Sequence, residues 1–522
     1  MRPLELAHLA LSWATAHPVT ALLSSALLLW VCGAYRGKLF PYLQGPLELP
    51  IIGALPWLLQ HRHDVLGALL ATTRAYGFKT WTVKWLGEPR YVMTADPRNL
   101  EHILKTRFAN YPKGANFSTT LADLLGSGIF ASDGSAWKQQ RHLFATLFSE
   151  NSFKTTVTAA FHKNGAALER ALLAAAAARA PLDVFALLNR FTLDTIGEIA
   201  FGVCIHSLEH PAHPFAAAFD EAQQTLDLRF FTPGWRWLRP FLPSERRLAS
   251  SIAVMDSFCA QLIAARRAEG EGALAARTDV LSRAMCLQTP EGARVFADSP
   301  SALRDLVLNF LIAGRDTTAQ ALSWAILSLC SAATPRGVEA QLAEECARVR
   351  ACSSAGGGAF APTYQALEQD MPFARAVMLE TLRLYPSVPK DVKSAVGHDV
   401  LPDGTAITPG TTVAYLPYVM GRSPALWGED ACAFSPARFV GQGAPSPWKL
   451  PAFNGAGPRA CLGQRMALAE SNFVLGLIFS RFSRACMRFC CCCVRLSLRA
   501  PSPFFAADPQ HPQHPQTLCC AQ

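Results

Sequence analysis

Long apolar segments with a helical period make up most of the chain, and short stretches rich in glycine and proline separate them. Pieces with strand-like composition are few and lie towards the two ends: "TWTVKW" (80–85), "PRYVMTA" (89–95) and "GTTVAYLPYV" (410–419). No internal repeat or sustained heptad is present. The pattern predicts a mainly α protein with small β-sheets, of the α+β class.

The longest predicted helix begins at Ser301, a good N-cap residue, and continues until Pro335 stops it. At 1.5 Å per residue its length is on the order of 45–50 Å, enough to cross a whole domain. It is apolar on most faces, so we expect it to run through the core. Two shorter helices are predicted near 372–386 and after Gly463.

The first 35 residues have the composition of a membrane anchor. Residues 6–35 contain no Asp, Glu, Lys or Arg, and the apolar run is long enough to cross a bilayer core of about 30 Å. Arg36 and Lys38 follow at once, which places the rest of the chain on the cytoplasmic side of a single-pass anchor. A cleaved signal peptide is the alternative.

Four regions follow from these patterns. We predict a transmembrane anchor over 1–35, a proline-rich hinge over 36–58, one large domain over 59–482 and an atypical Cys/Pro-rich tail over 483–522. The low complexity of the tail fits disorder or an altered gene end, and a lipidated or metal-binding segment is the alternative.

Composition and charge restrict the possible partners. The net charge of +9 is spread along the chain and favours an acidic protein partner or an anionic membrane surface, and no motif points to nucleic acid. The 16 cysteines have irregular spacings, which does not fit a disulfide scaffold. Cys204, Cys259, Cys330 and Cys346 lie in apolar or helical contexts, so we expect buried thiols in a reducing compartment.

Cys461 stands in "AFNGAGPRACLGQ", a Gly/Pro loop directly before a predicted helix. A dinucleotide fingerprint would need a preceding strand and an acidic residue about 20 positions later. Pro451 interrupts the preceding segment, and no acidic residue lies between Glu470 and Asp508. A zinc site is excluded because no second Cys or His stands at ligand spacing.

A lone thiolate at a helix N-terminus is the remaining interpretation. The helix dipole and free amides there favour a negative sulfur, and the glycines allow the backbone to approach a flat ligand. Such a sulfur suits haem iron, and Arg459 is placed to pair with a haem propionate.

The loop resembles the haem-binding loop of the cytochrome P450 family of haem-thiolate monooxygenases. The resemblance implies that Cys461 is the axial ligand of the iron and that Arg459, Phe453, Gly457 and Gly463 belong to the cofactor site.

The spacing within this loop departs from the family pattern. The family has the loop phenylalanine seven residues before the cysteine. Here Asn454 holds that place and Phe453 lies one position earlier, as if Gly455 or Ala456 were inserted.

Two further segments support the resemblance. "AGRDTT" resembles the family's acid–alcohol pair, which manages protons for bound oxygen, and implies catalytic roles for Asp316 and Thr317. The alternative is that Thr317 bonds back to its own helix and Asp316 pairs with Arg315.

"SDGSAWKQQRHLF" resembles the segment that reaches the second propionate and implies this role for Trp137 and Arg141. A packed Trp beside a solvated Arg is the alternative.

A structural network is implied by "FARAVMLETLRLYP" and "FSPARFV". The resemblance joins Glu380 and Arg383, three residues apart, to Arg438 in a buried network. An ordinary surface ion pair is the alternative. Ala437 stands where the family usually has an acid.

The resemblance implies a cytochrome P450 fold with haem b and an activity that uses O2 and electrons from an NADPH-dependent flavoprotein reductase. Animal fatty-acid hydroxylases of the family often carry a glutamate that links covalently to haem. This chain has Ala313 there, so we expect non-covalent haem.

Scaffold phrases such as "NYPKG", "PSVPKD" and "VLPDGT" resemble the plant and fungal branch that hydroxylates fatty acids and alkanes near the chain end. We therefore expect hydroxylation of an apolar, lipid-like substrate by an enzyme at the endoplasmic reticulum membrane, with its catalytic domain in the cytoplasm. Two alternatives stay open. One is a haem-thiolate isomerase or dehydratase that needs no reductase, and the other is a non-catalytic product of a damaged gene.

Overall fold

The structure is a computed structural model. It describes residues 18–20, 44–147, 153–178, 182–232, 234–288, 296, 299–353, 359–441, 443 and 445–482. Apart from 18–20, the predicted anchor lies outside these residues, and so does the whole predicted tail. The domain boundaries given above therefore remain predictions.

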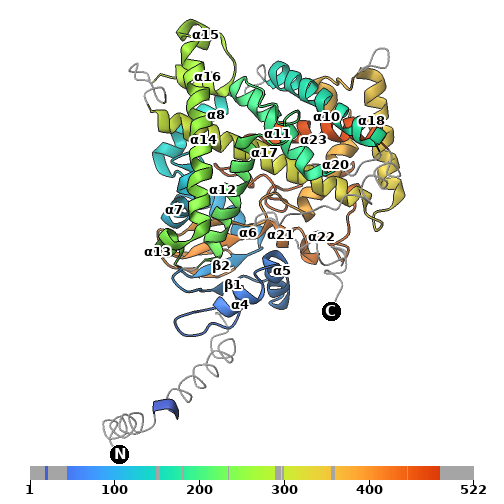
Figure 1. Ribbon diagram of the computed structural model, residues 1–522. Helices are drawn as coiled ribbons and strands as arrows, with labels where there is room; N and C mark the ends of the chain where they lie inside the picture. The colour runs from blue at the N-terminus through green and yellow to red at the C-terminus, as the bar shows by residue number, and fades with distance from the viewer. Residues whose placement is uncertain are drawn as a thin grey trace, which may run out of the picture.

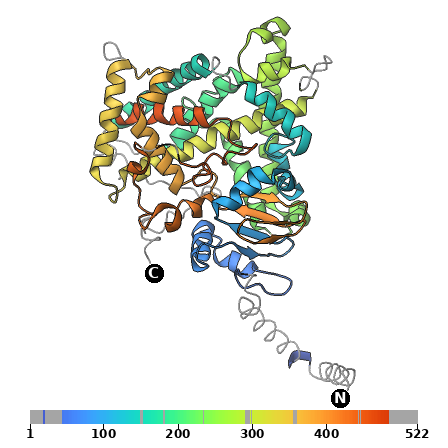
Figure 2. The same cartoon turned by 180° about the vertical axis from the view of Figure 1, so that it is seen from behind.

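Helices form most of the molecule, and the strands gather at one end of it (Figures 1 and 2). The helices before the middle of the chain are α4 (Leu55–Gln60), α5 (Val65–Ala75), α6 (Pro97–Glu101), η1 (His102–Thr106), η2 (Phe108–Asn110), α7 (Ala115–Leu125), α8 (Gly134–Leu147), η3 (Phe153–Val157), α10 (Thr158–Ala178), α11 (Val184–Phe201), α12 (Pro214–Phe231), α13 (Trp235–Leu238) and η4 (Arg239–Phe241). Those after it are α14 (Pro243–Ala268), α15 (Glu271–Ala276), α16 (Val280–Cys286), α17 (Pro300–Cys330), α18 (Arg336–Ser353), α19 (Tyr364–Gln369), α20 (Pro372–Leu384), α21 (Pro417–Met420), α22 (Pro424–Trp427), η5 (Pro436–Phe439) and α23 (Gln464–Phe479).

The main sheet joins the two ends of the chain. Its strands are β1 (Trp81–Val83), β2 (Tyr91–Thr94), β6 (Thr412–Tyr415) and β3 (Asp391–Ser394), in the order β1-β2-β6-β3. The β2–β6 pair is parallel and the other two pairs are antiparallel. β4 (Asp399–Val400) and β5 (Ala406–Ile407) form a separate hairpin. The three strands predicted from the sequence are confirmed, and the short β3, β4 and β5 were missed because they carry little strand periodicity.

The long predicted helix is confirmed as α17, which crosses the middle of the helical part (Figure 1). Its first turn differs from the prediction. Ser299, not Ser301, is the N-cap, and its hydroxyl accepts the Ala302 N–H at 3.3 Å. Pro300 occupies the first helical position, where its missing N–H is not needed, and this favours the earlier start.

Two hydrophobic clusters hold the molecule together. The larger surrounds α17 and includes buried residues of α11, α20 and α23, while the smaller lies on the sheet and includes Trp81, Val413 and Tyr415. Of the cysteines expected to be thiols in apolar surroundings, Cys259 and Cys346 are buried and free, and Cys204 is free and partly buried. A mainly helical α+β fold with small sheets is therefore confirmed.

α14 is, among the described residues, the one helix long and apolar enough to cross a membrane. It belongs to the globular body, because its Leu248, Met255 and Cys259 lie in the larger core. Its first turn is also tied inward by Glu245, which pairs with the buried Arg229 of α12 at 2.6 Å.

The described part of the predicted hinge lies against the sheet end of the molecule. The Thr82 N–H donates to the Gln44 carbonyl at 2.6 Å, and the Ala54 N–H donates to the Lys84 carbonyl at 2.8 Å. Arg90 pairs with Glu48 at 3.0 Å. From residue 44 onward, therefore, this segment is held on the domain.

Candidate functional site

The loop that carries Cys461 closes on itself directly before α23. The Cys461 N–H donates to the Phe453 carbonyl at 2.9 Å, and the Ala460 N–H donates to the Gly457 carbonyl at 2.9 Å. The amide of Gly463 forms a hydrogen bond with the Cys461 sulfur. The backbone thus places an N–H donor beside the sulfur, as a thiolate ligand requires.

Two consecutive residues of this loop are left-handed, at the place where the family pattern predicts an inserted residue. Asn454 has φ of 64° and Gly455 has φ of 70°. The Asn454 side chain stabilises this turn, because its Nδ2 donates to the Arg459 carbonyl at 3.0 Å and its Oδ1 lies 2.6 Å from the Tyr415 hydroxyl. Asparagine tolerates the left-handed region better than most residues. The turn lies before Gly457, and the hydrogen bond from the Cys461 N–H to the Phe453 carbonyl spans it.

Replacing Gly457 with alanine should destabilise this loop. A Cβ atom at position 457 would lie 2.1 Å from the carbonyl oxygen of Leu104, a backbone atom that cannot move aside alone. We expect the free energy of unfolding to fall by about 1–3 kcal/mol, as overpacking does elsewhere, and haem retention to fall with it. Urea unfolding and haem content would measure both. Gly443→Ala is the control, because a Cβ there meets nothing within 4 Å, and equal stability of the two variants would contradict the prediction.

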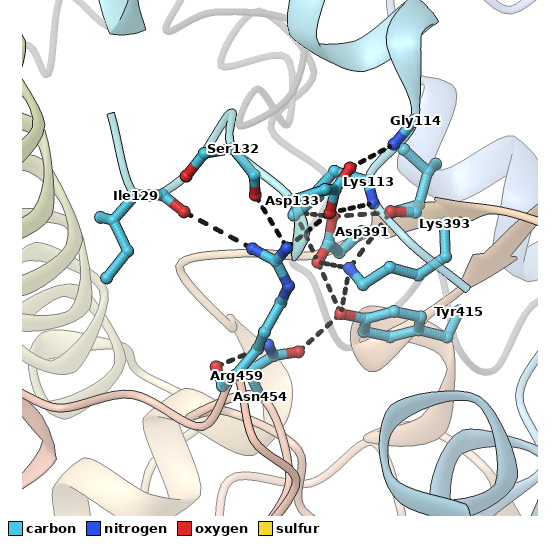
Figure 3. Close-up of polar contacts among 11 residues, drawn as sticks. Lys113, Gly114, Ile129, Ser132, Asp133, Asp391, Lys393, Tyr415, Asn454 and Arg459 are labelled. Carbon is cyan, nitrogen blue, oxygen red and sulfur yellow. Dashed lines mark hydrogen bonds and ion pairs between the residues drawn. The ribbon is translucent and has the colours of Figure 1, made fainter. Parts of the chain in front are cut away.

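Arg459 lies beside the loop in a cluster of polar groups (Figure 3). Its Nη2 donates to the Ser132 carbonyl at 2.8 Å and to Asp133 at 2.6 Å, and its guanidinium lies 4.5 Å from the centre of the Trp137 ring. Burial lowers its pKa, and its buried Nε has no hydrogen-bond partner among the described residues. The guanidinium can therefore accept a further anionic partner.

Arg141 lies one helical turn after Trp137 on α8, and the sequence predicts that both reach the same ligand. It is partly buried, and within the described residues it forms no hydrogen bond or ion pair. Burial lowers its pKa, while the charge of Cys461 acts in the opposite direction. Its positive charge also lowers the pKa of Arg459. Trp137, Arg141, Arg459 and Cys461 therefore lie close together.

A second cluster beside Arg459 was missed by the sequence reasoning. Asp391 Oδ2 lies 2.7 Å from Lys393 Nζ and 2.6 Å from the Tyr415 hydroxyl, and Asp391 Oδ1 lies 2.8 Å from Lys113 Nζ (Figure 3). Burial works against the ionised Asp391, but the two lysines hold its pKa well below the usual range. Burial lowers the pKa of Lys393 to about 7.

The signal for this cluster in the sequence was the presence of Lys113 and Asp391 in the family-like segments "NYPKG" and "PSVPKD". Only the fold brings these two residues together, because the segment before Lys113 lies along the end of β3, where the Ser394 N–H donates to the Pro112 carbonyl at 2.9 Å.

These residues fit the haem that the resemblance implies. A haem presents two carboxylates and one iron ligand site. Here the guanidinium groups of Arg141 and Arg459 can each bind an anion. Lys393 lies close enough to Arg459 for the charge of Arg459 to lower the pKa of Lys393. The Cys461 side chain is accessible, yet burial raises its pKa against the effects of the Gly463 amide and Arg141. A side chain that is both accessible and desolvated faces an enclosed space rather than open solvent.

The middle of α17 is also partly accessible, although this helix runs through the core. Ala313, Gly314, Asp316 and Thr317 are partly exposed, whereas the turns on either side are mostly buried. A core helix with an accessible middle borders an interior space, so this part of α17 is suited to face a cofactor.

Asp316 and Thr317 form the contacts of the structural alternative. The Thr317 hydroxyl donates to the Ala313 carbonyl at 2.8 Å, and Asp316 Oδ1 accepts from Arg315 at 3.0 Å. Burial raises the pKa of Asp316 to about 6 despite the charge of Arg315. Its buried Oδ2 has no hydrogen bond of ordinary geometry among the described residues. Each of the two side chains therefore contacts a residue of its own helix.

Glu380, Arg383 and Arg438 lie together in the structure, and Arg438 is partly exposed. Arg383 donates to both carboxylate oxygens of Glu380, at 2.6 and 2.7 Å, and both side chains are fully buried. Arg438 Nε lies 3.5 Å from Glu380 and its Nη1 donates to the Trp427 carbonyl at 3.0 Å. Arg438 also pairs with Asp430, an acid that lies seven positions before Ala437.

Comparisons with known proteins cover the part of the chain that carries this site. A family model described as "Cytochrome P450" matches residues 43–489. "Cytochrome P450 704C1" of Pinus taeda is 38% identical over 79% of this chain and 82% of its own length. "Cytochrome P450 monooxygenase cyp1" of Mycosarcoma maydis is 35% identical over 85% of this chain and 70% of its own length. "Cytochrome P450 94C1" of Arabidopsis thaliana is 37% identical over 75% and 78%, respectively.

Proposed function

The chain belongs to the cytochrome P450 family, and on that premise we propose that it hydroxylates a long-chain fatty acid or a related lipid, near the chain end. The family makes it an oxidoreductase that uses haem b held by a cysteine thiolate. We assign the ligand to Cys461. The observation that supports this assignment is the convergence of the Gly463 amide, Arg141 and Arg459 around that cysteine.

When bound, haem supplies the oxygen chemistry: one atom of O2 enters a substrate C–H bond and the other leaves as water, with two electrons and two protons consumed. The Gly463 amide and the charge of Arg141 stabilise negative charge on the Cys461 sulfur. Arg141 and Arg459 would hold the propionates, and Trp137 packs beside Arg459.

Protons would reach the oxygen site through α17. Asp316 takes up and releases a proton near neutral pH, because burial raises its pKa to about 6. Thr317 is the next residue along the helix and carries a hydroxyl that can pass the proton on. Both residues lie on the partly exposed middle of the helix.

Electrons would come from a separate protein, because the chain has no flavin or nicotinamide motif. We propose an NADPH-dependent flavoprotein reductase as the donor. The net charge of +9 suits the docking of an acidic partner.

Membrane association is supported by apolar side chains on the described surface. Trp237 and Phe241 are 82% and 79% exposed on α13 and η4, and Ile51 is 90% exposed before α4. α13 and α4 both lie towards the sheet end of the molecule (Figure 1). We propose that this end contacts the endoplasmic reticulum membrane and that residues 1–35 anchor the enzyme, with the catalytic domain in the cytoplasm. Such a location would bring lipid substrates close to the site.

The function is tested by turnover of fatty acids of graded length with NADPH, a reductase and O2. We expect hydroxylated product that depends on all three. Conversion of a fatty-acid hydroperoxide without reductase would support the isomerase or dehydratase alternative, and failure to incorporate haem would support the damaged-gene alternative. Release of haem into acidified organic solvent would show that it is non-covalent, as we propose because Ala313 stands where a linking glutamate would be.

Loss of the acid–alcohol pair should uncouple the reaction. We expect Asp316→Asn or Thr317→Ala to lower product formation by about 100-fold, while NADPH oxidation falls less, because proton delivery and not electron transfer is impaired. Thr317→Ser is the matched control, since it keeps the hydroxyl and should keep most of the activity. Full coupling of NADPH oxidation to product in Asp316→Asn would assign Asp316 to the structural alternative.

A further inference from the structure

One nitrogen of Arg315 is shared between two carboxylates. Its Nη1 lies 2.7 Å from Asp220 Oδ1 on α12 and 3.0 Å from Asp316 Oδ1 on α17. The guanidinium also lies 5.3 Å from the centre of the buried Phe219 ring. The side chains of Arg315 and Asp316 are 5% and 15% exposed, whereas that of Asp220 is 52% exposed. A carboxylate at the surface thus holds a buried cation beside the acid that the proposed mechanism uses.

The contact between Arg315 and Asp316 is half of what the two groups can form. An arginine often binds a carboxylate through two nitrogens and both oxygens. Here Arg315 gives Asp316 one nitrogen. Arg315 Nε and Asp316 Oδ2 are both buried, and within the described residues neither has a hydrogen bond of ordinary geometry. Since the same Nη1 also contacts Asp220, the ion pair across the helix interface keeps the guanidinium from binding Asp316 through two nitrogens.

The charges around Asp316 act in opposite directions. Burial raises its pKa to about 6, the positive charge of Arg315 lowers it, and the negative charge of Asp220 raises it. Asp227, further along α12, is buried, and burial together with the charge of Asp316 favours its neutral form by raising its pKa. Acids on the neighbouring helices α11 and α20 have partners of their own: Asp194 with Ser207, Glu198 with Lys163 and Glu380 with Arg383.

We propose that Asp220 is a positioning residue for proton delivery, which holds Arg315 on α12 and so prevents that cation from fully neutralising Asp316. Asp316 then keeps enough proton affinity to hold a proton near neutral pH and to release it towards the oxygen site. Without Asp220, the guanidinium is free to bind both oxygens of Asp316, and the ionised form of Asp316 is favoured. The role of Asp220 rests on the proposed monooxygenase function, in which Asp316 delivers protons.

Asp220→Asn in the holoenzyme tests this role. The amide keeps the size of the side chain and removes its charge, and the half-exposed position tolerates the change. We expect the midpoint of Asp316 protonation to fall by about 1 pH unit, because a nearby cation lowers the pKa of a carboxyl group by about 1–3 units. Infrared difference spectra over a pH series measure this midpoint, and the carboxyl band that is absent from Asp316→Asn identifies the residue.

Turnover with reductase provides the second readout. The product formed per NADPH oxidised should fall with rising pH as Asp316 loses its proton, and in Asp220→Asn this fall should begin at lower pH. Asp220→Glu keeps the charge and should keep the wild-type profile. Glu221→Gln is the matched control, since Glu221 is the next residue of α12 and pairs with the exposed Arg247 at 2.7 Å. It should change neither readout.

Arg315→Gln should move the midpoint of Asp316 in the opposite direction, to higher pH, because it removes the cation that favours the ionised acid. A general loosening of the contact between α12 and α17 would not produce opposite shifts in the two variants. A shift in the same direction in both would therefore overturn the role of Asp220.

The remaining outcomes separate this role from the function on which it rests. If the wild type forms no product with O2 and reductase, the proposed function fails and the role of Asp220 fails with it. If the wild type is active and Asp220→Asn keeps the wild-type midpoint in the infrared spectra, only the role of Asp220 is overturned. A shifted midpoint with an unchanged turnover profile would also overturn it, because the charge of Asp220 would then not affect proton delivery.

Discussion

Cys461→Ser should abolish the strongly red-shifted Soret band of the ferrous carbonyl complex and lower monooxygenase turnover by at least about 100-fold. Changes that only touch the surroundings of a metal ligand already lower affinity or activity by about 10- to 100-fold, and this change removes the ligand itself. A serine hydroxyl beside the Gly463 amide carries no thiolate charge, so it cannot donate electron density as sulfur does. Absorption spectra of the reduced protein with and without carbon monoxide measure the effect.

The control for this substitution is Cys352→Ser. Cys352 is exposed on α18 and is not part of the site, so Cys352→Ser shows how the spectrum responds to the loss of a thiol outside the site. A shifted band in Cys352→Ser together with an unshifted one in Cys461→Ser assigns the ligand. An unshifted band in the wild type would instead mean that the turn at Asn454 and Gly455 prevents thiolate ligation, and the monooxygenase proposal would be withdrawn.

The sequence predicted those parts of the site that depend on local spacing. Trp137 and Arg141 are one turn apart on a helix, and Cys461 and Gly463 share one loop, so their relation is fixed within a few residues. α17 was predicted because its apolar pattern continues without a break. Its exact start was not, because Ser299 and Ser301 both suit an N-cap and only Pro300 decides between them.

The parts that depend on tertiary contacts could not be predicted. Lys113 and Asp391 are 278 residues apart and meet only because the segment before Lys113 is hydrogen-bonded to the end of β3. The accommodation of the extra loop residue depends on Tyr415, whose hydroxyl holds the side chain of Asn454. The sequence shows only that this loop is one residue longer than the family pattern. The partner that stabilises the longer loop becomes visible only in the fold.

Arg383→Met should lower the free energy of unfolding by about 3–5 kcal/mol, because it leaves the fully buried carboxylate of Glu380 without its charged partner. Arg383 also donates to the carbonyls of Gly421, Ala431 and Ala433, and these three would lose a donor. A loss of this size is a large fraction of the stability of a typical domain. Chemical unfolding and haem yield on expression would measure it.

The surface pair Glu344–Arg348 on α18 provides the control. Its two charged groups lie 3.2 Å apart, and both side chains are largely exposed. Arg348→Met should change the stability by no more than about 0.5 kcal/mol. Similar losses for the two arginine variants would mean that the interior network is no stronger than a surface pair.

The double variant Glu380→Leu/Arg383→Met should recover part of the loss, because it removes the stranded charge. Recovery should stay incomplete, since the three carbonyls and the Ser435 N–H, which Glu380 accepts at 2.7 Å, still lack partners. The network therefore holds residues 421–435 against α20.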